Sequence, residues 1–214
     1  QSIKDLTIKE IIESVGNNGQ AFCRALLDGG TDEENFVGQT LLVLEFDGDL
    51  KYREFKEKCE KYSLSYAFTY KTLGSCANQK GFGAVFLMDR WIKNPALAKA
   101  ANILLRAFFS PVGAECLNLG GYFLGGKGII EKKPYAKINI VELARNLEIY
   151  YWETKGRNNS KELKRLGKKS GICVKNGELC IYNENEFDLE GIEDKINDNG
   201  IIMLPYSEGK ACEG

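Results

Sequence analysis

The feature that most constrains this chain is the order in which short apolar runs alternate with helical repeats between residues 40 and 128. Apolar runs too short for a typical helix predict buried strands, whereas apolar residues repeated every three or four positions predict helices. In chain order the segments are a strand at 40–46, a helix at 51–62, strands at 65–71 and 82–88, a helix at 95–109 and a strand at 122–124. This βαββαβ order predicts an α+β fold, a ferredoxin-like or RRM-like antiparallel sheet with both helices on one face.

Further elements are predicted on either side of this core. Thr7 is placed to cap a short helix through about Val15. Two more helices are predicted at 140–154 and 160–169, and the pair Asn176-Gly177 predicts the two-residue turn of a β-hairpin.

The charge pattern suggests how the chain is divided. Residues 155–169 carry seven basic residues against one acidic residue, whereas residues 178–214 carry ten acidic residues against two lysines. We therefore expect one domain at 1–135 and a smaller helix-and-hairpin subdomain with an acidic tail at 136–214.

Composition excludes several classes of site and of protein. The chain has no histidine, which removes histidine general bases, Ser/His/Asp and Cys/His triads and imidazole metal sites. Seven cysteines occur without a C-x-x-C pair, no apolar run approaches the roughly 18 residues of a membrane span, and no secretion signal opens the chain. These features predict a cytoplasmic protein with unpaired thiols and no membrane partner. Because the chain begins at Gln1, we expect a processed product or a piece of a longer protein.

A pair of carboxylates lies at the end of the first predicted strand. Glu45 and Asp47 alternate along it, so their side chains share one face with Cα atoms about 7 Å apart. Two divalent metal ions roughly 4 Å apart need such hard oxygen ligands to assist phosphoryl transfer. Asp49 is a candidate third ligand. The alternative is a polar strand end followed by a turn.

Basic residues predict a second kind of site. Lys161, Lys164, Lys168 and Lys169 fall on one helical face, where they can follow the phosphates of DNA. The alternative is a solvated helix face. The glycine-rich stretch 125–128, which includes Lys127, either approaches a phosphate through its backbone amides or is a simple strand exit.

Two cysteines face each other across the predicted hairpin. Cys173 and Cys180 lie opposite each other on either side of the turn, close enough for a disulfide or a soft metal ion. The alternative, two free thiols on the wetter strand face, agrees better with their polar neighbours.

Together, residues 8–128 resemble the primase-polymerase branch of the archaeo-eukaryotic primase superfamily, in the form found in replication proteins of plasmids and phages. The resemblance rests on the order and spacing of several stretches, which are 19–22, 35–39, 43–48, 68–72, 82–89 and 122–127. It implies that Glu45 and Asp47 are the metal-binding catalytic acids and that Mg²⁺ or Mn²⁺ is the cofactor of an active enzyme.

The chain departs from this family at several functional positions. The histidine expected near residues 71–73 is missing, and basic residues expected near the third strand and before the last one are Gly81, Gly83 and Gly121. The expected third acid falls on Gly113, which leaves Glu115 as the nearby carboxylate. Lys71, Lys80 and Lys127 are the remaining candidates for binding nucleotide phosphates.

Three functions follow as hypotheses. The first is a catalytically eroded primase-polymerase fold, a pseudoenzyme that binds DNA or a replication partner. The second is an active template-directed DNA primase or polymerase, a nucleotidyltransferase that uses Glu45 and Asp47 with two divalent metals. The third is an interaction module of a mobile element that binds only protein. The lost cations favour the first, because phosphoryl transfer depends on electrostatic stabilisation.

Overall fold

A computed structural model of the chain describes residues 7–29, 33–48, 50–73, 81–109, 119–155, 172–175, 178–183 and 202–205. Its helical segments are α1 (Ile8–Ile11), the π-helical η2 (Ile12–Asn17), the 3₁₀ turn η3 (Glu33–Asn35), α2 (Tyr52–Lys61), α3 (Pro95–Ala107) and α4 (Ile140–Lys155). Its strands are β1 (Phe22–Cys23), β2 (Ala25–Leu27), β3 (Phe36–Phe46), β4 (Phe68–Thr72), β5 (Phe82–Ile92), β6 (Tyr122–Phe123), β7 (Gly126–Lys132), β8 (Ile172–Lys175), β9 (Glu178–Asn183) and β10 (Ile202–Pro205).

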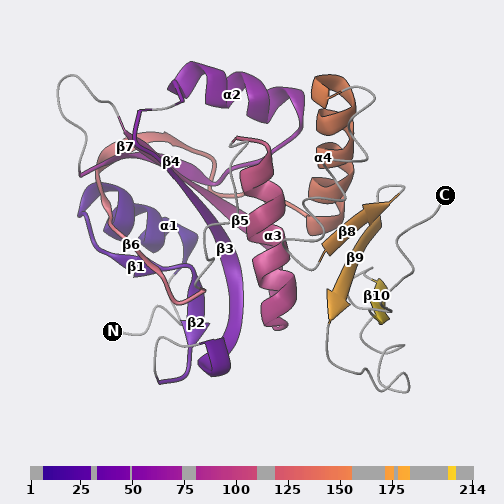
Figure 1. The fold of residues 1–214 in the computed structure, drawn as a ribbon. Helices are drawn as coiled ribbons and strands as arrows, with labels where there is room; N and C mark the ends of the chain where they lie inside the picture. Colours follow the sequence, from indigo (N-terminus) through magenta and orange to yellow (C-terminus); the bar gives the residue numbers. More distant parts are fainter. Residues whose placement is uncertain are drawn as a thin grey trace.

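The main sheet has five antiparallel strands in the order β2-β3-β5-β4-β7. This confirms the α+β class and the antiparallel pairing predicted from the sequence. The strand order differs at both edges from the ferredoxin-like arrangement, in which the last strand pairs with the first. Here β2 pairs with β3, and the last strand of the sheet, β7, pairs with β4 (Figure 1).

The predicted fourth strand at 122–124 is therefore not part of the main sheet. Its residues form β6, which pairs with β1 in a separate two-stranded sheet. The fourth strand is β7, which begins within the stretch interpreted as a glycine-rich strand exit. Glycine permits that pairing, because a Cβ on Gly126 would lie 2.7 Å from the Tyr70 ring and 3.0 Å from the carbonyl oxygen of Gly16.

One face of the sheet is covered by α2 and α3, as predicted. Leu42 and Leu44 of β3 share a core with Phe55 of α2 and Leu104 of α3. Asn94 caps α3 through hydrogen bonds from the Ala96 and Leu97 amides, and Pro95 occupies its first turn. The period-2 alternation of β3 thus directs its even-numbered apolar residues to this layer.

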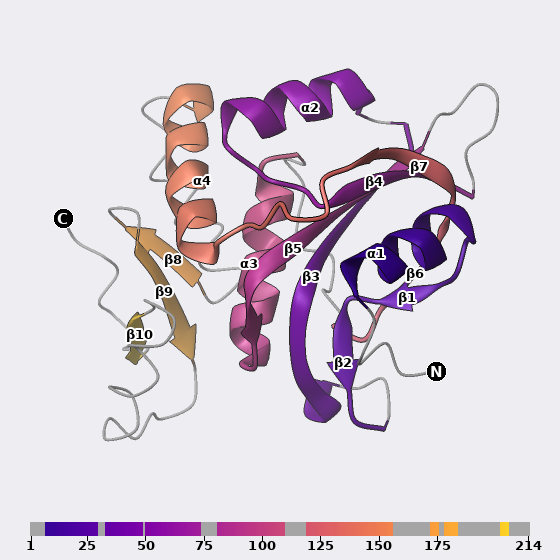
Figure 2. The same ribbon diagram turned by 180° about the vertical axis from the view of Figure 1, so that it is seen from behind.

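The other face is covered by α1 and η2. Leu41 and Val43 of β3 pack there with Ile12 and Val15. Figure 1 shows α3 in front of the sheet, and the reverse view in Figure 2 shows α1 in front of it. Thr7 caps α1 in a capping box with Glu10, as its position predicts.

The C-terminal elements agree with the sequence in part. α4 matches the predicted helix, and it packs Leu143, Ala144 and Leu147 into the same core as α2 and α3. β8 and β9 form the predicted antiparallel hairpin, with Cys173 and Cys180 in register. The helix predicted at 160–169 lies outside the described residues, and the domain boundary near 135 stays a prediction.

Candidate functional site

The two predicted catalytic acids lie at the end of β3. Glu45 is the penultimate residue of that strand, Asp47 follows it, and both residues are exposed. Alternation places Glu45 on the same face as Leu41 and Val43, away from the core under α2 and α3. With both predicted helices on one face, the opposite face was expected to be free of helices, and this expectation is wrong because α1 and η2 cover part of it.

A tyrosine crosses the sheet to reach Glu45. Glu45 pairs with Gly83 of β5, and Gly83 pairs with Tyr70 of β4. Because Gly83 has no side chain, the fully buried ring of Tyr70 lies directly over it, and a Cβ there would lie 2.6 Å from both Cε1 and Oη. The Tyr70 hydroxyl then donates a 3.2 Å hydrogen bond to Glu45 Oε1.

This contact and the surrounding protein change the acidity of both groups. Loss of hydration raises the pKa of Glu45, and the negative charge of Asp47 raises it further, while the hydrogen bond from Tyr70 opposes both effects. Burial and the neighbouring Glu45 raise the pKa of Tyr70 above its ordinary value. Tyr70 therefore remains protonated at neutral pH and acts as a donor.

Glu45, Gly83 and Tyr70 form one row across the three strands. A second row, which contains Gly81 and Thr72, lies beside it and nearer the strand ends. The Thr72 amide donates to the Gly81 carbonyl at 3.2 Å, and Thr72 pairs with Gly126 of β7. A Cβ on Gly81 would lie 2.5 Å from Thr72 Oγ1 and 3.7 Å from the Cα of Asp47. The Thr72 hydroxyl is buried and has no hydrogen-bond partner among the described residues. The floor of this site is therefore glycine backbone, one hydroxyl and two carboxylates.

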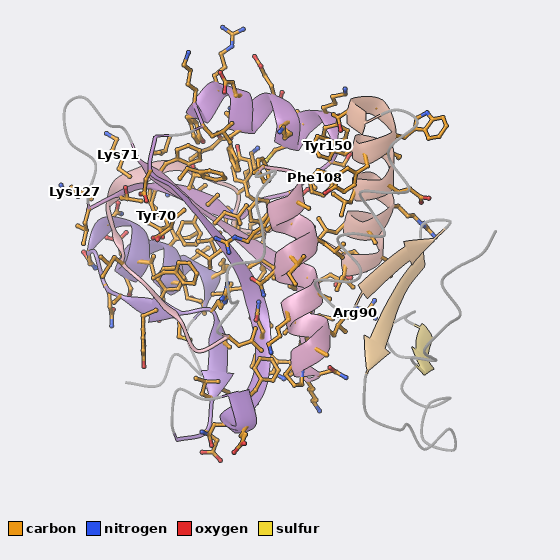
Figure 3. All side chains as sticks on the ribbon, in the orientation of Figure 1. Tyr70, Lys71, Arg90, Phe108, Lys127 and Tyr150 are labelled. Atoms are coloured by element: carbon orange, nitrogen blue, oxygen red, sulfur yellow. The ribbon has the colours of Figure 1, made fainter. Side chains whose placement is uncertain are left out.

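The cations predicted for this site do not converge on the carboxylates. Lys71 pairs with Phe82, whose ring packs in the core under α2, so alternation turns Lys71 away from the face that carries Glu45. Figure 3 shows Lys71 and Lys127 at the same end of the sheet as Tyr70. Both lysines are exposed, and neither makes an ion pair with Glu45 or Asp47 in the part of the chain that the structure describes.

The remaining predicted site residues lie outside the described residues. They are the candidate metal ligands Asp49 and Glu115, the candidate phosphate ligand Lys80, and the candidate DNA-binding residues Lys161, Lys164, Lys168 and Lys169. Among the residues that are described, no group of three histidine, cysteine, aspartate or glutamate side chains is placed to hold a metal ion.

Tyr70 is the site residue that sequence reasoning did not single out. It lies in the stretch 68–72, where the resemblance directed attention to a missing histidine one to three residues away. Glycine at 83, within an otherwise bulky strand, was the available signal, because an empty position in a sheet is filled by a neighbour. The pairing register was needed to identify that neighbour.

Comparisons with known proteins found no relative of this chain. No protein-family model matches the chain, and neither the curated proteins nor the solved structures give a significant match. Within the described residues, no helix is long and apolar enough to cross a membrane.

Proposed function

We propose that this protein is a primase-polymerase-like domain of plasmid or phage DNA replication that has lost catalysis and binds DNA or a replication partner. The observation that carries the proposal is the Tyr70 ring over Gly83, with its hydroxyl on Glu45. At the position where the family resemblance calls for a cation, the chain has a glycine covered by a neutral aromatic ring.

A glycine and a neutral ring in place of a cation remove the positive charge on which phosphoryl transfer most depends. The reaction depends on positioning and on stabilising the negative charge that develops on the phosphoryl oxygens. Losing one such donor lowers the rate by about 10²–10³.

The arrangement of the central strands supports the family resemblance. The order β3-β5-β4, with α2 between the first two strands in the chain and α3 after the third, is that of a split βαβ core. The acids at the end of β3 occupy the place that the resemblance assigns to catalytic carboxylates. We propose that the outer strands β2 and β7 are a variation around that core.

One observation favours the second candidate function, an active nucleotidyltransferase. Glu45 and Asp47 are exposed at one strand end, beside the buried hydroxyl of Thr72, which has no hydrogen-bond partner in the part of the chain that the structure describes. An active site would take Mg²⁺ or Mn²⁺ on the two carboxylates and draw positive charge from Lys71, Lys80 and Lys127.

DNA binding by the full chain tests the proposal. Fluorescence anisotropy with labelled DNA should show binding that weakens as salt rises, because lysine contacts to phosphates release counterions. Replacing Lys161, Lys164 and Lys168 with alanine should weaken binding equally for different sequences and lower the salt slope by about one per lost phosphate contact. Absence of any DNA binding would rule out the DNA-binding form of the proposal and favour a chain that binds only protein.

A further inference from the structure

The turn between β7 and α4 carries the most exposed large apolar side chain among the described residues. Tyr135 is 78% exposed, compared with 66% for Trp152 and 40% for Trp91. Within the described part of the chain its ring makes no aromatic contact and its hydroxyl makes no hydrogen bond. The ring is therefore available to a ligand.

The backbone holds this ring on a fixed support. Pro134 occupies the second position of a turn that is closed by a 2.8 Å hydrogen bond from the Ala136 amide to the Lys133 carbonyl. On one side the Lys133 amide donates to Ala67 of the chain leading into β4, at 2.6 Å. On the other side the Ile138 amide donates to Leu87 of β5 at 2.8 Å. A ligand that docks on Tyr135 therefore does not have to order the loop first.

The charge around the ring is positive. Lys132 and Lys137 flank the turn, both are exposed, and neither makes an ion pair among the described residues. Lys133 is used internally, since its ammonium lies 3.2 Å from Glu131 and 4.3 Å from the Tyr66 ring centroid. Glu131 also pairs with Lys56 at 3.1 Å, so the acid nearest to the turn in the sequence is already neutralised.

This combination fits one class of ligand. An exposed aromatic ring stacks on an unpaired base, and lysines on both sides of it bind the phosphates before and after that base. The bases of a duplex are stacked on one another and cannot use the ring. We infer that the turn 132–137 is a contact point for single-stranded nucleic acid, with Tyr135 stacking on a base and Lys132 and Lys137 binding phosphates.

This inference rests on the proposed DNA-binding function and adds to it a strand preference and a site. The test is anisotropy of the full chain with labelled oligothymidylate and with a labelled duplex. Tyr135→Ala should weaken binding to the single strand by about 5- to 150-fold and leave duplex binding unchanged. Tyr135→Trp should retain the affinity, because the indole ring also stacks.

A matched control is Tyr122→Ala, which removes a 71% exposed tyrosine from β6 and should leave both affinities unchanged. Lys132→Ala with Lys137→Ala should reduce the salt slope for the single strand by about 1.4, or about 0.7 for each phosphate contact. Circular dichroism should show that each variant is folded, since the replaced side chains support no core contact.

The outcomes separate the inference from the function on which it rests. Normal single-strand binding by Tyr135→Ala would overturn the inference and leave DNA binding intact. Equal weakening on single strand and duplex would also overturn it, because stacking on an unpaired base would not be the cause. A wild-type chain that binds neither DNA would reject the proposed DNA binding on which the inference rests.

Discussion

The two faces of the main sheet are built from different kinds of residue. Under α2 and α3 the space is filled by large rings, and Phe55 has its centroid 5.3 Å from that of Phe82 and 5.4 Å from that of Tyr66. On the opposite face, at the strand ends, Gly81 and Gly83 leave positions empty and Tyr70 fills one of them. On the first face, the buried volume of packed aromatic rings stabilises the fold. The second is defined by missing side chains next to carboxylates, where we propose that a catalytic site has been lost.

The largest expected effect tests the sheet face under α2 and α3, which we call the filled face. Phe55 is fully buried, so Phe55→Ala removes a ring from a dense aromatic cluster and leaves a cavity. We expect the free energy of unfolding to fall by about 3–5 kcal/mol, measured by urea denaturation. Phe55→Leu, which keeps most of the volume, should cost less than about 1.5 kcal/mol. Equal losses for the two variants would show that the volume of the cluster is not what matters.

A double-mutant cycle tests the opposite face, which carries Gly81 and Gly83 and which we call the glycine face. In Gly83→Ala the new methyl group collides with the Tyr70 ring, which should cost about 1–3 kcal/mol of unfolding free energy. In a Tyr70→Ala background the same change should cost almost nothing, because the ring is no longer there. Additive effects of the two substitutions would mean that Tyr70 does not fill the place above Gly83.

Substitution of Glu131 tests how much its ion pairs and hydrogen bonds stabilise the edge of the filled face. It accepts hydrogen bonds or ion pairs from Tyr52, Lys56 and Lys133, and these cationic and hydroxyl partners lower its pKa to about 2 although burial opposes them. Glu131→Gln should cost about 1–2 kcal/mol at neutral pH. Glu57→Gln, which disturbs only the exposed pair with Arg53, should cost much less.

The pH dependence of the Glu131 effect follows from the direction of its shift. A lowered pKa means that the ionised carboxylate stabilises the folded state fully above its ordinary value of 4.5. That stability is lost as the pH falls from 4.5 toward about 2. The difference in unfolding free energy between wild type and Glu131→Gln should therefore shrink over this range, and a constant difference would contradict the assigned ion pairs.

Glu45 should show the smallest effect, with the opposite sign. Its pKa is raised, so the folded protein holds the proton more tightly, and ionisation above pH 4.5 opposes folding. Glu45→Gln should leave the unfolding free energy at neutral pH unchanged or raise it by less than about 1 kcal/mol, because the residue is exposed. A clear loss of stability would mean that Glu45 anchors the structure and is not a residue of a functional site.

Much of the filled face could be predicted from the sequence. The helical repeat of Tyr52, Phe55, Cys59 and Tyr62 and the apolar run at 40–46 gave the elements and their shared face, because burial of apolar side chains follows the period of each element. The capping position of Thr7 was equally local, and it matches the structure. The hairpin predicted around Asn176-Gly177 agrees with the antiparallel pairing of β8 and β9, while the turn itself lies outside the described residues.

The glycine face could not be predicted in the same way. The strand β7 begins with Gly126 and contains charged residues, so its sequence lacks the apolar run that marks a buried strand. Which strand lies beside which is decided by contacts across the chain, and the Tyr70–Gly83–Glu45 row appears only once the pairing register is known. The acids were predicted as site residues from the sequence, and their role stays a prediction, whereas the tyrosine that covers the floor beside them was not predicted.

Calorimetric titration of a deoxynucleoside triphosphate with Mn²⁺ tests the central claim most directly. If Tyr70 over Gly83 replaces the triphosphate ligands, the full chain should take up no nucleotide under conditions in which it binds DNA. Primer extension should likewise be undetectable, and Glu45→Ala with Asp47→Ala should change neither result. Nucleotide uptake and incorporation that disappear in that double variant would contradict the account and establish an active nucleotidyltransferase.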